Sequence, residues 1–472
     1  MKRLLPCLAF WVSLTPVFGA PDRGEVIAAL KKAVTYYSNH AALRGGYVYY
    51  YSPDFTRRLG EGEATATEIW VQPPGTPAVG GAFLRAYEAT GDRFYLDLAK
   101  EAGAALRHGQ LESGGWRNSI DFDASGPRAD RYRDGRGNGG KGKNFSTLDD
   151  DITQSALRFL IALDAATGFE DAATHEAVKF ALENLLAAQF PNGAFPQGWT
   201  GPVESRQELP ASFPGYDWRT EGRIKNYWDQ YTLNDGAAGT ITDLLIAAHE
   251  TYEDPKFLEA LTKLGEFLIQ AQLPAPQRAW AQQYGPEMHP IWARAFEPPA
   301  VSGRESEDAM IALLKIADHT GENRFLEPVV PGVKYLESSL LKDGQLARYY
   351  ELETNRPLYM KRSGKVYELT HDDSSLPDHY GWKNPHQLEW IKAGYRRLAG
   401  GKSLKFADGT AVDVETVALV LKALDDQGRW ITKHDPDGPR LVGQPKFQPG
   451  EEYLSSAVFV ENVNVLSAFL KP

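Results

Sequence analysis

The chain of 472 residues carries 51 Lys and Arg against 62 Asp and Glu, which gives a formal net charge of −11. This acidic balance argues against a nucleic-acid partner. A polyanionic ligand would need locally concentrated arginine or a bridging cation. The 11 Trp, 22 Tyr and 21 Phe are typical of sugar-binding clefts, although most rings in any protein lie in its core.

The first 20 residues have the pattern of a secretory signal peptide. Basic residues stand at positions 2 and 3, an apolar run covers positions 4 to 18, and small residues follow at 19 and 20. The pattern predicts cleavage after Ala20, which changes the charge from −11 to −13 because two basic residues are lost. The run is shorter than the roughly 20 apolar residues of a membrane helix. We therefore expect a secreted or periplasmic monomer with no membrane segment, in which residues 21–472 form a single catalytic domain.

The only cysteine, Cys7, lies within this predicted signal peptide. The mature chain would then contain no cysteine, which excludes an internal disulfide and a thiolate metal site. The fold must therefore be held together by packing alone.

Four turns of similar sequence recur at 90–94, 167–170, 252–257 and 320–325. On both sides of each turn, apolar residues return every three or four positions, which predicts a pair of helices. Glycine stands at three of the four turns, where a helix must end. The repeat therefore predicts a series of helical hairpins.

A short aromatic element follows the second helix of each hairpin. Its copies lie at 114–116, 193–195, 278–280 and 344–349, and an earlier one at 45–47 follows the first helix. Hairpins whose loops return to the same end indicate an all-α fold, an α/α toroid of the (α/α)3 barrel type. Its long loops would form one cleft, since long ordered loops are usually functional.

Two loop segments have unusual compositions. Residues 127–143 carry six Lys or Arg among five glycines, but the glycines do not follow a strand and lack a GK[ST] ending. A flexible lid or a plain surface loop is therefore favoured over a phosphate cradle. Residues 215–235 mix Trp and Tyr with Arg, Lys and Asp, as expected of a cleft wall.

Arginine is concentrated in residues 346–362, LARYYELETNRPLYMKR, which contain Arg348, Arg356 and Arg362. Planar guanidinium groups at this density suit a ligand that bears carboxylates. The alternative is a solvated loop whose arginines only pair with Glu351 and Glu353.

Aspartate is concentrated just before two predicted inner helices. Asp149, Asp150 and Asp151 precede one, and Asp235 follows Asn234 before the next. These carboxylates could cap the helices, or they could bind calcium, which prefers hard oxygen ligands. No HExxH, Walker or GxSxG motif is present, so metalloprotease, nucleotide hydrolase and serine hydrolase functions have little support.

Arg294 lies a little ahead of a further helix start, which we expect near Ser306 with Glu307 and Asp308 in its first turn. Asp149, Asp235, Arg294 and Arg348 thus occupy the same kind of junction in different hairpins. We expect them to converge at one end of the toroid.

Several segments together resemble the tenth polysaccharide lyase family, whose members are pectate (pectic acid) lyases with an α/α toroid catalytic domain. The resemblance covers about residues 76–382. It is carried, in the same order, by the segments TLDDDITQSALRFL, GAFPQGW, YTLNDGAA, ARAFEPPAVSGRES and ARYYELETNRPLY.

The resemblance implies cleavage of polygalacturonate by β-elimination, with calcium (Ca2+) as cofactor. It implies that Asp149 binds calcium with Asp150 beside it, and that Asp235 is a second acidic contact to metal or substrate. Arg294 would be the base. The chain departs from the family pattern at Asp150, where Asn is common, and at Gly236, where a second Asp is frequent. The substrate contacts would be Arg348, Arg362, Arg356, Asp150 and Asn234.

Three alternatives remain open from the sequence. A glycoside hydrolase on the same toroid would use two carboxylic acids about 5 to 10 Å apart, with candidates among Asp149, Asp150, Asp229 and Asp235. A lyase for another uronate polysaccharide would keep the elimination chemistry. A non-catalytic periplasmic glycan-binding protein would explain the aromatic loops but would not need the arginine and aspartate junctions.

Overall fold

A computed structural model describes residues 21–471 of the chain, except 127, 138–141 and 405–411. The predicted signal peptide, with Cys7, lies outside the described residues. Twelve α-helices run through the described part, and the strands are short. The helices are α1 (Arg23–Ala41), α2 (Thr76–Thr90), α3 (Arg93–His108), α4 (Ile152–Ala166), α5 (Ala172–Ala187), α6 (Ala237–Tyr252), α7 (Pro255–Ala271), α8 (Gly303–Thr320), α9 (Val329–Ser338), α10 (Leu388–Ala399), α11 (Val414–Ala423) and α12 (Ser456–Leu470).

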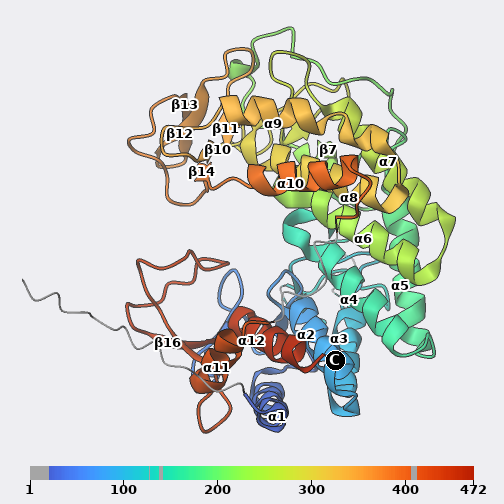
Figure 1. Ribbon diagram of the computed structural model, residues 1–472, viewed down its shortest axis with the longest axis vertical. Helices are drawn as coiled ribbons and strands as arrows, with labels where there is room; N and C mark the ends of the chain where they lie inside the picture. The colour runs from blue at the N-terminus through green and yellow to red at the C-terminus, as the bar shows by residue number, and fades with distance from the viewer. Residues whose placement is uncertain (1–20, 127, 138–141, 405–411, 472) are drawn as a thin grey trace, which may run out of the picture.

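The even-numbered helices follow one another around the molecule (Figure 1). Helix α12 contacts α2, and contacts continue from α2 to α4, α6, α8 and α10. The odd-numbered helices pack against this inner series, as α3 does on α2 and α4. The predicted α/α toroid of helical hairpins is therefore confirmed.

The four predicted hairpins are α2/α3, α4/α5, α6/α7 and α8/α9. In the last, a 3-10 helix, η5 (Asn323–Leu326), precedes α9. Gly91, Gly168 and Gly321 have positive φ angles between 64 and 74° at the turns, where a side chain would be strained. In the third hairpin, which lacks glycine, Glu253 takes the same left-handed conformation with φ 53°.

A turn closed by a backbone hydrogen bond follows every outer helix of the described chain, and the aromatic element lies at this turn. In the first copy the N–H of Leu43 donates to the carbonyl of Gly46, and corresponding bonds, which differ in span, recur around the ring. The structure adds a sixth copy, at Gly428 to Trp430 after α11, which the sequence pattern did not reveal. The six bonds join 43 to 46, 111 to 115, 190 to 194, 273 to 279, 341 to 345, and 425 to 429.

Short antiparallel ladders tie the start of each inner helix to the turn that follows its outer partner. Strand β5 (Ser146–Thr147), just before α4, pairs with β6 (Gly198–Trp199), which follows α5. Strand β7 (Tyr231–Thr232) pairs in the same way with β8 (Gln283–Tyr284), and β9 (Val301–Ser302) with β11 (Tyr349–Tyr350). The junctions of successive hairpins therefore lie at one end of the toroid.

The remaining strands belong to the loops at this end. Strand β11 also pairs with β12, which forms a hairpin with β13, and β3 pairs with β4. Their bounds are β1 (Tyr50–Tyr51), β2 (Arg58–Leu59), β3 (Glu68–Trp70), β4 (Ser119–Asp121), β10 (Leu346–Ala347), β12 (Pro357–Ser363), β13 (Val366–Thr370), β14 (Lys383–Asn384), β15 (Ile431–Lys433) and β16 (Glu452–Ser455).

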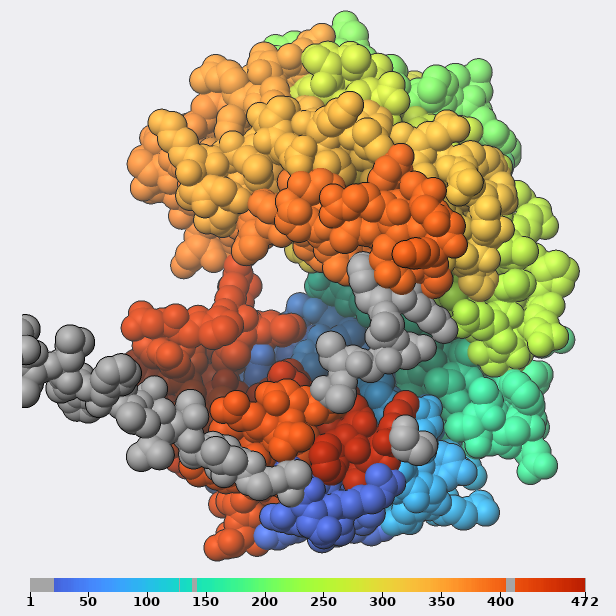
Figure 2. Space-filling view, in the orientation of Figure 1, coloured from blue at the N-terminus to red at the C-terminus, as the bar shows by residue number. Residues whose placement is uncertain are grey.

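The two ends of the described chain pack together. Tyr37 of α1 stacks on Phe459 of α12 with ring centroids 4.0 Å apart, and its hydroxyl lies 2.7 Å from Ser456 Oγ. Strand β1 pairs with β16 beside them. Figure 2 shows the N-terminal residues, in blue, against the C-terminal residues, in red, on one side of the molecule.

Two local features differ from, or add to, the sequence analysis. Helix α8 starts at Gly303, not near Ser306, because Ser302 caps it and accepts from the N–H of Glu305. The described part of the basic segment 127–143 is held by ion pairs, including Arg128 with the buried Glu68.

None of the helices in the described residues is long and apolar enough to cross a membrane.

Gly193 offers a test of the repeated turn. Its φ is 90°, and a Cβ would lie 1.9 Å from the carbonyl oxygen of Lys263, whereas the equivalent Gly344, with φ 76°, faces open space. We expect Gly193→Ala to lower the free energy of unfolding by more than about 3 kcal/mol and Gly344→Ala by about 1 kcal/mol. Urea unfolding measures both, and equal losses would contradict the steric argument.

Candidate functional site

Two neighbouring inner helices begin with the same unusual backbone turn. A 3-10 turn at η1 (Asp149–Asp151) leads into α4, and one at η4 (Asn234–Gly236) leads into α6. Asp150 and Asp235 have φ angles of 46 and 53°, in the left-handed region that costs energy for residues other than glycine. Such strain is found most often at functional sites.

None of these aspartates makes a side-chain hydrogen bond that caps the helix it precedes. The N-cap of α4 is Asp151 and the N-cap of α6 is Gly236, and neither makes a side-chain cap. Asp151 instead pairs with Arg158, 2.5 Å away on α4. The interpretation of the aspartates as capping residues is therefore wrong.

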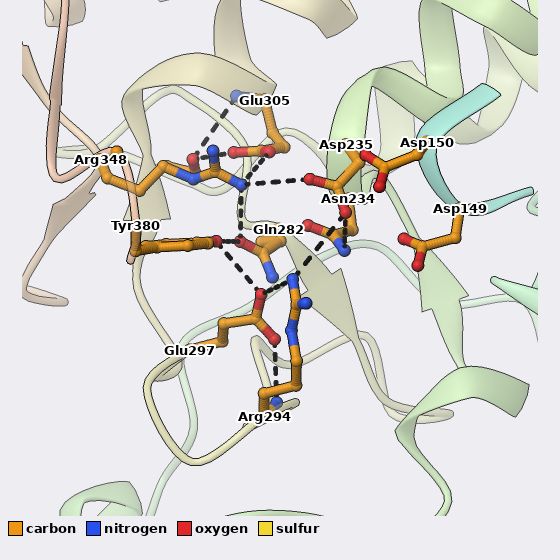
Figure 3. A network of polar contacts seen from close by, with 12 residues as sticks. Asp149, Asp150, Asn234, Asp235, Gln282, Arg294, Glu297, Glu305, Arg348 and Tyr380 are labelled. Carbon is orange, nitrogen blue, oxygen red and sulfur yellow. Dashed lines mark hydrogen bonds and ion pairs between the residues drawn. The ribbon is translucent and has the colours of Figure 1, made fainter. Parts of the chain in front are cut away.

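The turns bring Asp149, Asp150 and Asp235 together (Figure 3). Each offers a carboxylate oxygen, and these oxygens all lie within 4.8 Å of one another. In the part of the chain that the structure describes, no other group of three His, Cys, Asp or Glu side chains meets this condition. The predicted convergence of the acidic junctions is thus observed.

Neutral side chains hold the outer two carboxylates. Gln197 donates to Asp149 Oδ1 at 2.7 Å, and Gln72 donates to Asp150 Oδ2 at 3.0 Å. Within the described residues no cation lies within 4.0 Å of either carboxylate, whereas Asp235 has the guanidinium groups of Arg294 and Arg348 at 3.9 Å each. The negative charge of the cluster is therefore only partly compensated.

The cluster is electrostatically poised to bind a cation. Burial and the neighbouring charge of Asp235 raise the pKa of Asp149 well above its ordinary value. The same two causes raise the pKa of Asp150 to about 6. A divalent cation would relieve this repulsion, and three carboxylate oxygens are ligands of the kind that calcium takes. The residues present therefore fit a calcium site.

Arg294 reaches the cluster from the loop between β8 and β9. Its Nη2 lies 2.5 Å from Glu297 Oε1, and its backbone N–H donates to Glu297 Oε2 at 2.9 Å. Burial acts to lower the pKa of Arg294, but the hydrogen bond and charge of Glu297 outweigh it and raise that pKa above its ordinary value. In this state Arg294 is a firmly held cation.

Arg348 is buried, with 2% of its surface exposed. Its Nη2 donates to Glu305 Oε1 at 2.8 Å and to Gln282 Oε1 at 3.3 Å, and its guanidinium lies 4.9 Å from the ring centre of Tyr380. The Nε atoms of both Arg294 and Arg348 are buried without a hydrogen-bond partner. Unpaired buried donors of this kind are uncommon, and each arginine thus keeps one unused donor within the described structure.

The other two predicted arginines do not join this network. Arg362, exposed on β12, donates from Nε to the carbonyl of Gly364 at 2.9 Å and lies 5.6 Å from the ring centre of Tyr367. Arg356 is exposed, and its hydrogen bonds within the described chain involve only its backbone. Glu351 pairs with Arg219 at 2.8 Å, and the buried Arg348 pairs with Glu305. The alternative of a solvated loop whose arginines only pair with Glu351 and Glu353 is therefore wrong.

Asn234 and Asp235 form one unit. Asn234 is buried and donates from Nδ2 to Asp235 Oδ2 at 2.6 Å, and its own Oδ1 has no partner. Asn234 holds the same position in η4 that Asp149 holds in η1. Asp235 in turn corresponds to Asp150, and Gly236 corresponds to Asp151.

Several residues of the network were not predicted. Glu297 and Glu305 lie inside the segment ARAFEPPAVSGRES, and Gln197 lies inside GAFPQGW, so the motifs contained them. Tyr380, whose hydroxyl donates to Glu297 at 3.1 Å, belongs to no predicted site. No local sequence signal distinguishes Gln72 or Gln282, because only the fold brings these amides to the site.

A model of the pectic acid lyase family matches residues 110–346, half of the chain. The matched range includes Asp149, Asp235 and Arg294 and ends two residues before Arg348. The protein is therefore a polysaccharide lyase. It belongs to the pectic acid lyase family. No curated protein matches the chain.

Three solved structures are similar to the chain. The family 10 polysaccharide lyase from Cellvibrio cellulosa is 19% identical, with 68% of this chain and 97% of that chain covered and a TM-score of 0.47. A mutant of that lyase in complex with trigalaturonic acid is 18% identical, with 69 and 97% covered and a TM-score of 0.46. Cellobiose 2-epimerase from Bacillus thermoamylovorans is 14% identical, with 95 and 99% covered and a TM-score of 0.47.

The raised pKa of Asp150 predicts how the metal-free protein responds to pH. Because the folded-state pKa, about 6 against an ordinary 3.8, exceeds the unfolded one, the folded state binds this proton more tightly. Its contribution to stability is therefore lost as pH rises from about 4 to about 6. With EDTA present, Asp150→Asn should lose less stability than the wild type over that interval.

The thermal midpoint at pH 4 and pH 7, on either side of that interval, measures this difference. The exposed Asp426, whose side chain makes no hydrogen bond or ion pair within the described residues, provides the control, and Asp426→Asn should follow the wild type. An unchanged pH dependence in Asp150→Asn would contradict the electrostatic description of the cluster.

Proposed function

We propose that this polysaccharide lyase is a pectate lyase that cleaves polygalacturonate by calcium-assisted β-elimination and releases 4,5-unsaturated oligogalacturonides. Membership of the pectic acid lyase family supports the substrate. The observation that carries the mechanism is the approach of Arg294 and Arg348 to opposite oxygens of Asp235, each at 3.9 Å, beside two further carboxylates. The arginines that would bind a substrate carboxylate and the aspartates that would bind calcium would thus lie side by side.

The reaction requires removal of the proton on C5 of a galacturonate and departure of the oxygen on C4. The C5 proton is weakly acidic because the adjacent carboxylate already carries a negative charge. Asp149, Asp150 and Asp235 would hold the calcium ion, which supplies positive charge to the substrate carboxylate as the enolate-like transition state forms. Asn234 would keep Asp235 oriented through their 2.6 Å hydrogen bond.

Arg294 is the proposed base, and its guanidine Nη would receive the C5 proton. A neutral arginine is costly, since from a pKa of about 12.5 its formation at pH 9 costs roughly 5 kcal/mol. The contact with Glu297 increases that cost in the free protein. We therefore propose that Arg294 exchanges its hydrogen bond to Glu297 for substrate, next to cationic charge that disfavours its protonated form.

Tyr380 would ease this exchange. Its hydroxyl donates to the same oxygen of Glu297 that Arg294 contacts. When Arg294 turns away, the buried Glu297 carboxylate would keep this hydrogen bond and the bond from the backbone N–H of Arg294. An unpaired buried charge, which costs several kcal/mol, is thereby avoided.

Arg348 and Arg362 would hold substrate carboxylates on the side of the site away from Asp149. Arg362 is exposed, so its guanidinium can meet a chain in solution. Arg348 is buried and would act through its unpaired Nε and its charge. Arg356, also exposed, is proposed as an outer contact. Export, as the N-terminal sequence predicts, would bring the protein to a polymer outside the cell.

The arrangement favours elimination over hydrolysis. A glycosidase needs two carboxyl groups on opposite sides of the bond, about 5 to 10 Å apart. Asp149, Asp150 and Asp235 instead gather three oxygens within 4.8 Å of one another, as a cation site requires.

Metal removal tests the calcium proposal. Treatment with EDTA should abolish the ultraviolet absorbance of the unsaturated uronate product, and calcium should restore it. Asp149→Asn should need a much higher calcium concentration for the same rate, whereas Asp426→Asn should behave as the wild type. A rate of product formation that stays constant in excess EDTA across neutral and alkaline pH would contradict the calcium proposal.

Substitution of the base tests the role of Arg294. Arg294→Lys keeps a cation but changes its position and geometry, so kcat on polygalacturonate should fall by about a thousandfold or more. Binding of polygalacturonate, measured by calorimetry, should persist. Turnover near that of the wild type would show that another residue is the base.

A further inference from the structure

A second concave site lies beside the aspartate cluster. It is a pocket of about 470 Å³ between the loop that carries Glu61 and the basic segment that carries Arg128 and Lys143. Ligand pockets usually measure about 300 to 1,000 Å³. Nothing in the proposed elimination uses this pocket. It is lined by Glu61, Gly62, Trp70, Arg117, Asn118, Ser119, Arg128, Ala129, Asp130, Gly142 and Lys143.

One amide connects the pocket to the aspartate cluster. The Nε2 group of Gln72 donates to Asp150 Oδ2 at 3.0 Å and to Glu61 Oε1 at 3.2 Å. Asp150 belongs to the cluster, and Glu61 lines the pocket. The aspartate cluster and the pocket are therefore neighbours, and the buried side chain of Gln72 lies between them.

The pocket wall offers donors for an anion, although the chain as a whole is acidic. Arg117 contacts Asp130 only through Nη1, at 2.9 Å, and every side-chain hydrogen bond of Arg128 also starts from Nη1. Within the described residues, the Nε and Nη2 groups of Arg117 and Arg128 make no hydrogen bond. Among the described residues, no carboxylate lies within ion-pair distance of the Lys143 ammonium.

The wall also has the character of a sugar site. Trp70 lines the pocket, and its indole N–H is buried without a hydrogen-bond partner. Asn118 and Ser119 add uncharged polar groups. Trp70 is almost fully buried, with 3% of its surface exposed, so the polar groups beside it are the ones that a sugar hydroxyl could meet.

We propose that this pocket is a remote subsite that binds an acidic sugar residue of the polysaccharide, with Lys143, Arg117 and Arg128 directed at its carboxylate. The proposal rests on the proposed function, because it takes the same uronate chain as the ligand. The pocket would hold a part of that chain away from the bond that breaks. Its effect should therefore depend on substrate length.

Lys143→Gln is the most direct variant, because it removes a charge without breaking an ion pair. The matched control is Arg131→Gln, in the same segment, since Arg131 pairs with Glu112 at the surface and does not line the pocket. We expect Lys143→Gln to lower kcat/KM on polygalacturonate about three- to tenfold, as one charge-assisted contact would. On trigalacturonate the variant should equal the wild type, and Arg131→Gln should match the wild type on both substrates.

Equilibrium binding separates this proposal from the proposed function. Calorimetry with hexagalacturonate and calcium should show weaker binding by Lys143→Gln than by the wild type or Arg131→Gln, whether or not product forms. Wild-type binding without unsaturated product would overturn the proposed elimination but not the subsite. The subsite proposal would be overturned if Lys143→Gln lowered kcat/KM equally on the short and the long substrate, or if Arg131→Gln lowered it as much as Lys143→Gln. Unchanged hexagalacturonate binding by Lys143→Gln would also overturn it.

Discussion

Mutual repulsion among Asp149, Asp150 and Asp235 is the constraint around which the site is built. Three carboxylate oxygens within 4.8 Å of one another are unfavourable unless protons, donors or a cation share the space. The fold imposes this arrangement by starting two adjacent inner helices with left-handed turns at Asp150 and Asp235. Packing of α4 against α6 then fixes the distance between the turns.

Arg294 and Arg348 compensate the negative charge of the cluster only in part, because each lies closer to a glutamate than to Asp235. Arg294 pairs with Glu297 and Arg348 with Glu305, at 2.5 and 2.8 Å, whereas both stand 3.9 Å from Asp235. Both glutamates are almost fully buried. A buried carboxylate fixes its arginine in position and also stabilises its protonated form. The free protein therefore holds two paired cations beside the carboxylate cluster.

The toroid supplies the rigidity that this arrangement requires. In the described chain a hydrogen-bonded turn follows each of six outer helices, and the short ladders hold the inner helix starts at a common end. Side chains on rigid element ends can be placed more accurately than side chains on long free loops. The pocket beside Glu61 lies in loops at this same end, so the repeat accounts for the position of both sites.

The sequence by itself determined the helical hairpins, since apolar periodicity and turn residues are local signals. It also placed Asp149, Asp235, Arg294 and Arg348 at equivalent junctions, because the repeat gives their position relative to the helices. The sixth turn at Gly428 was not recognised, because the segments around it lack the turn motif of the four predicted hairpins. Only the tertiary structure decided which arginines meet the carboxylates, separating Arg348 from Arg356 and Arg362. It alone brought Gln72, Gln282 and Glu305 to the site, because contacts between residues far apart in the chain depend on packing across the toroid and leave no local pattern.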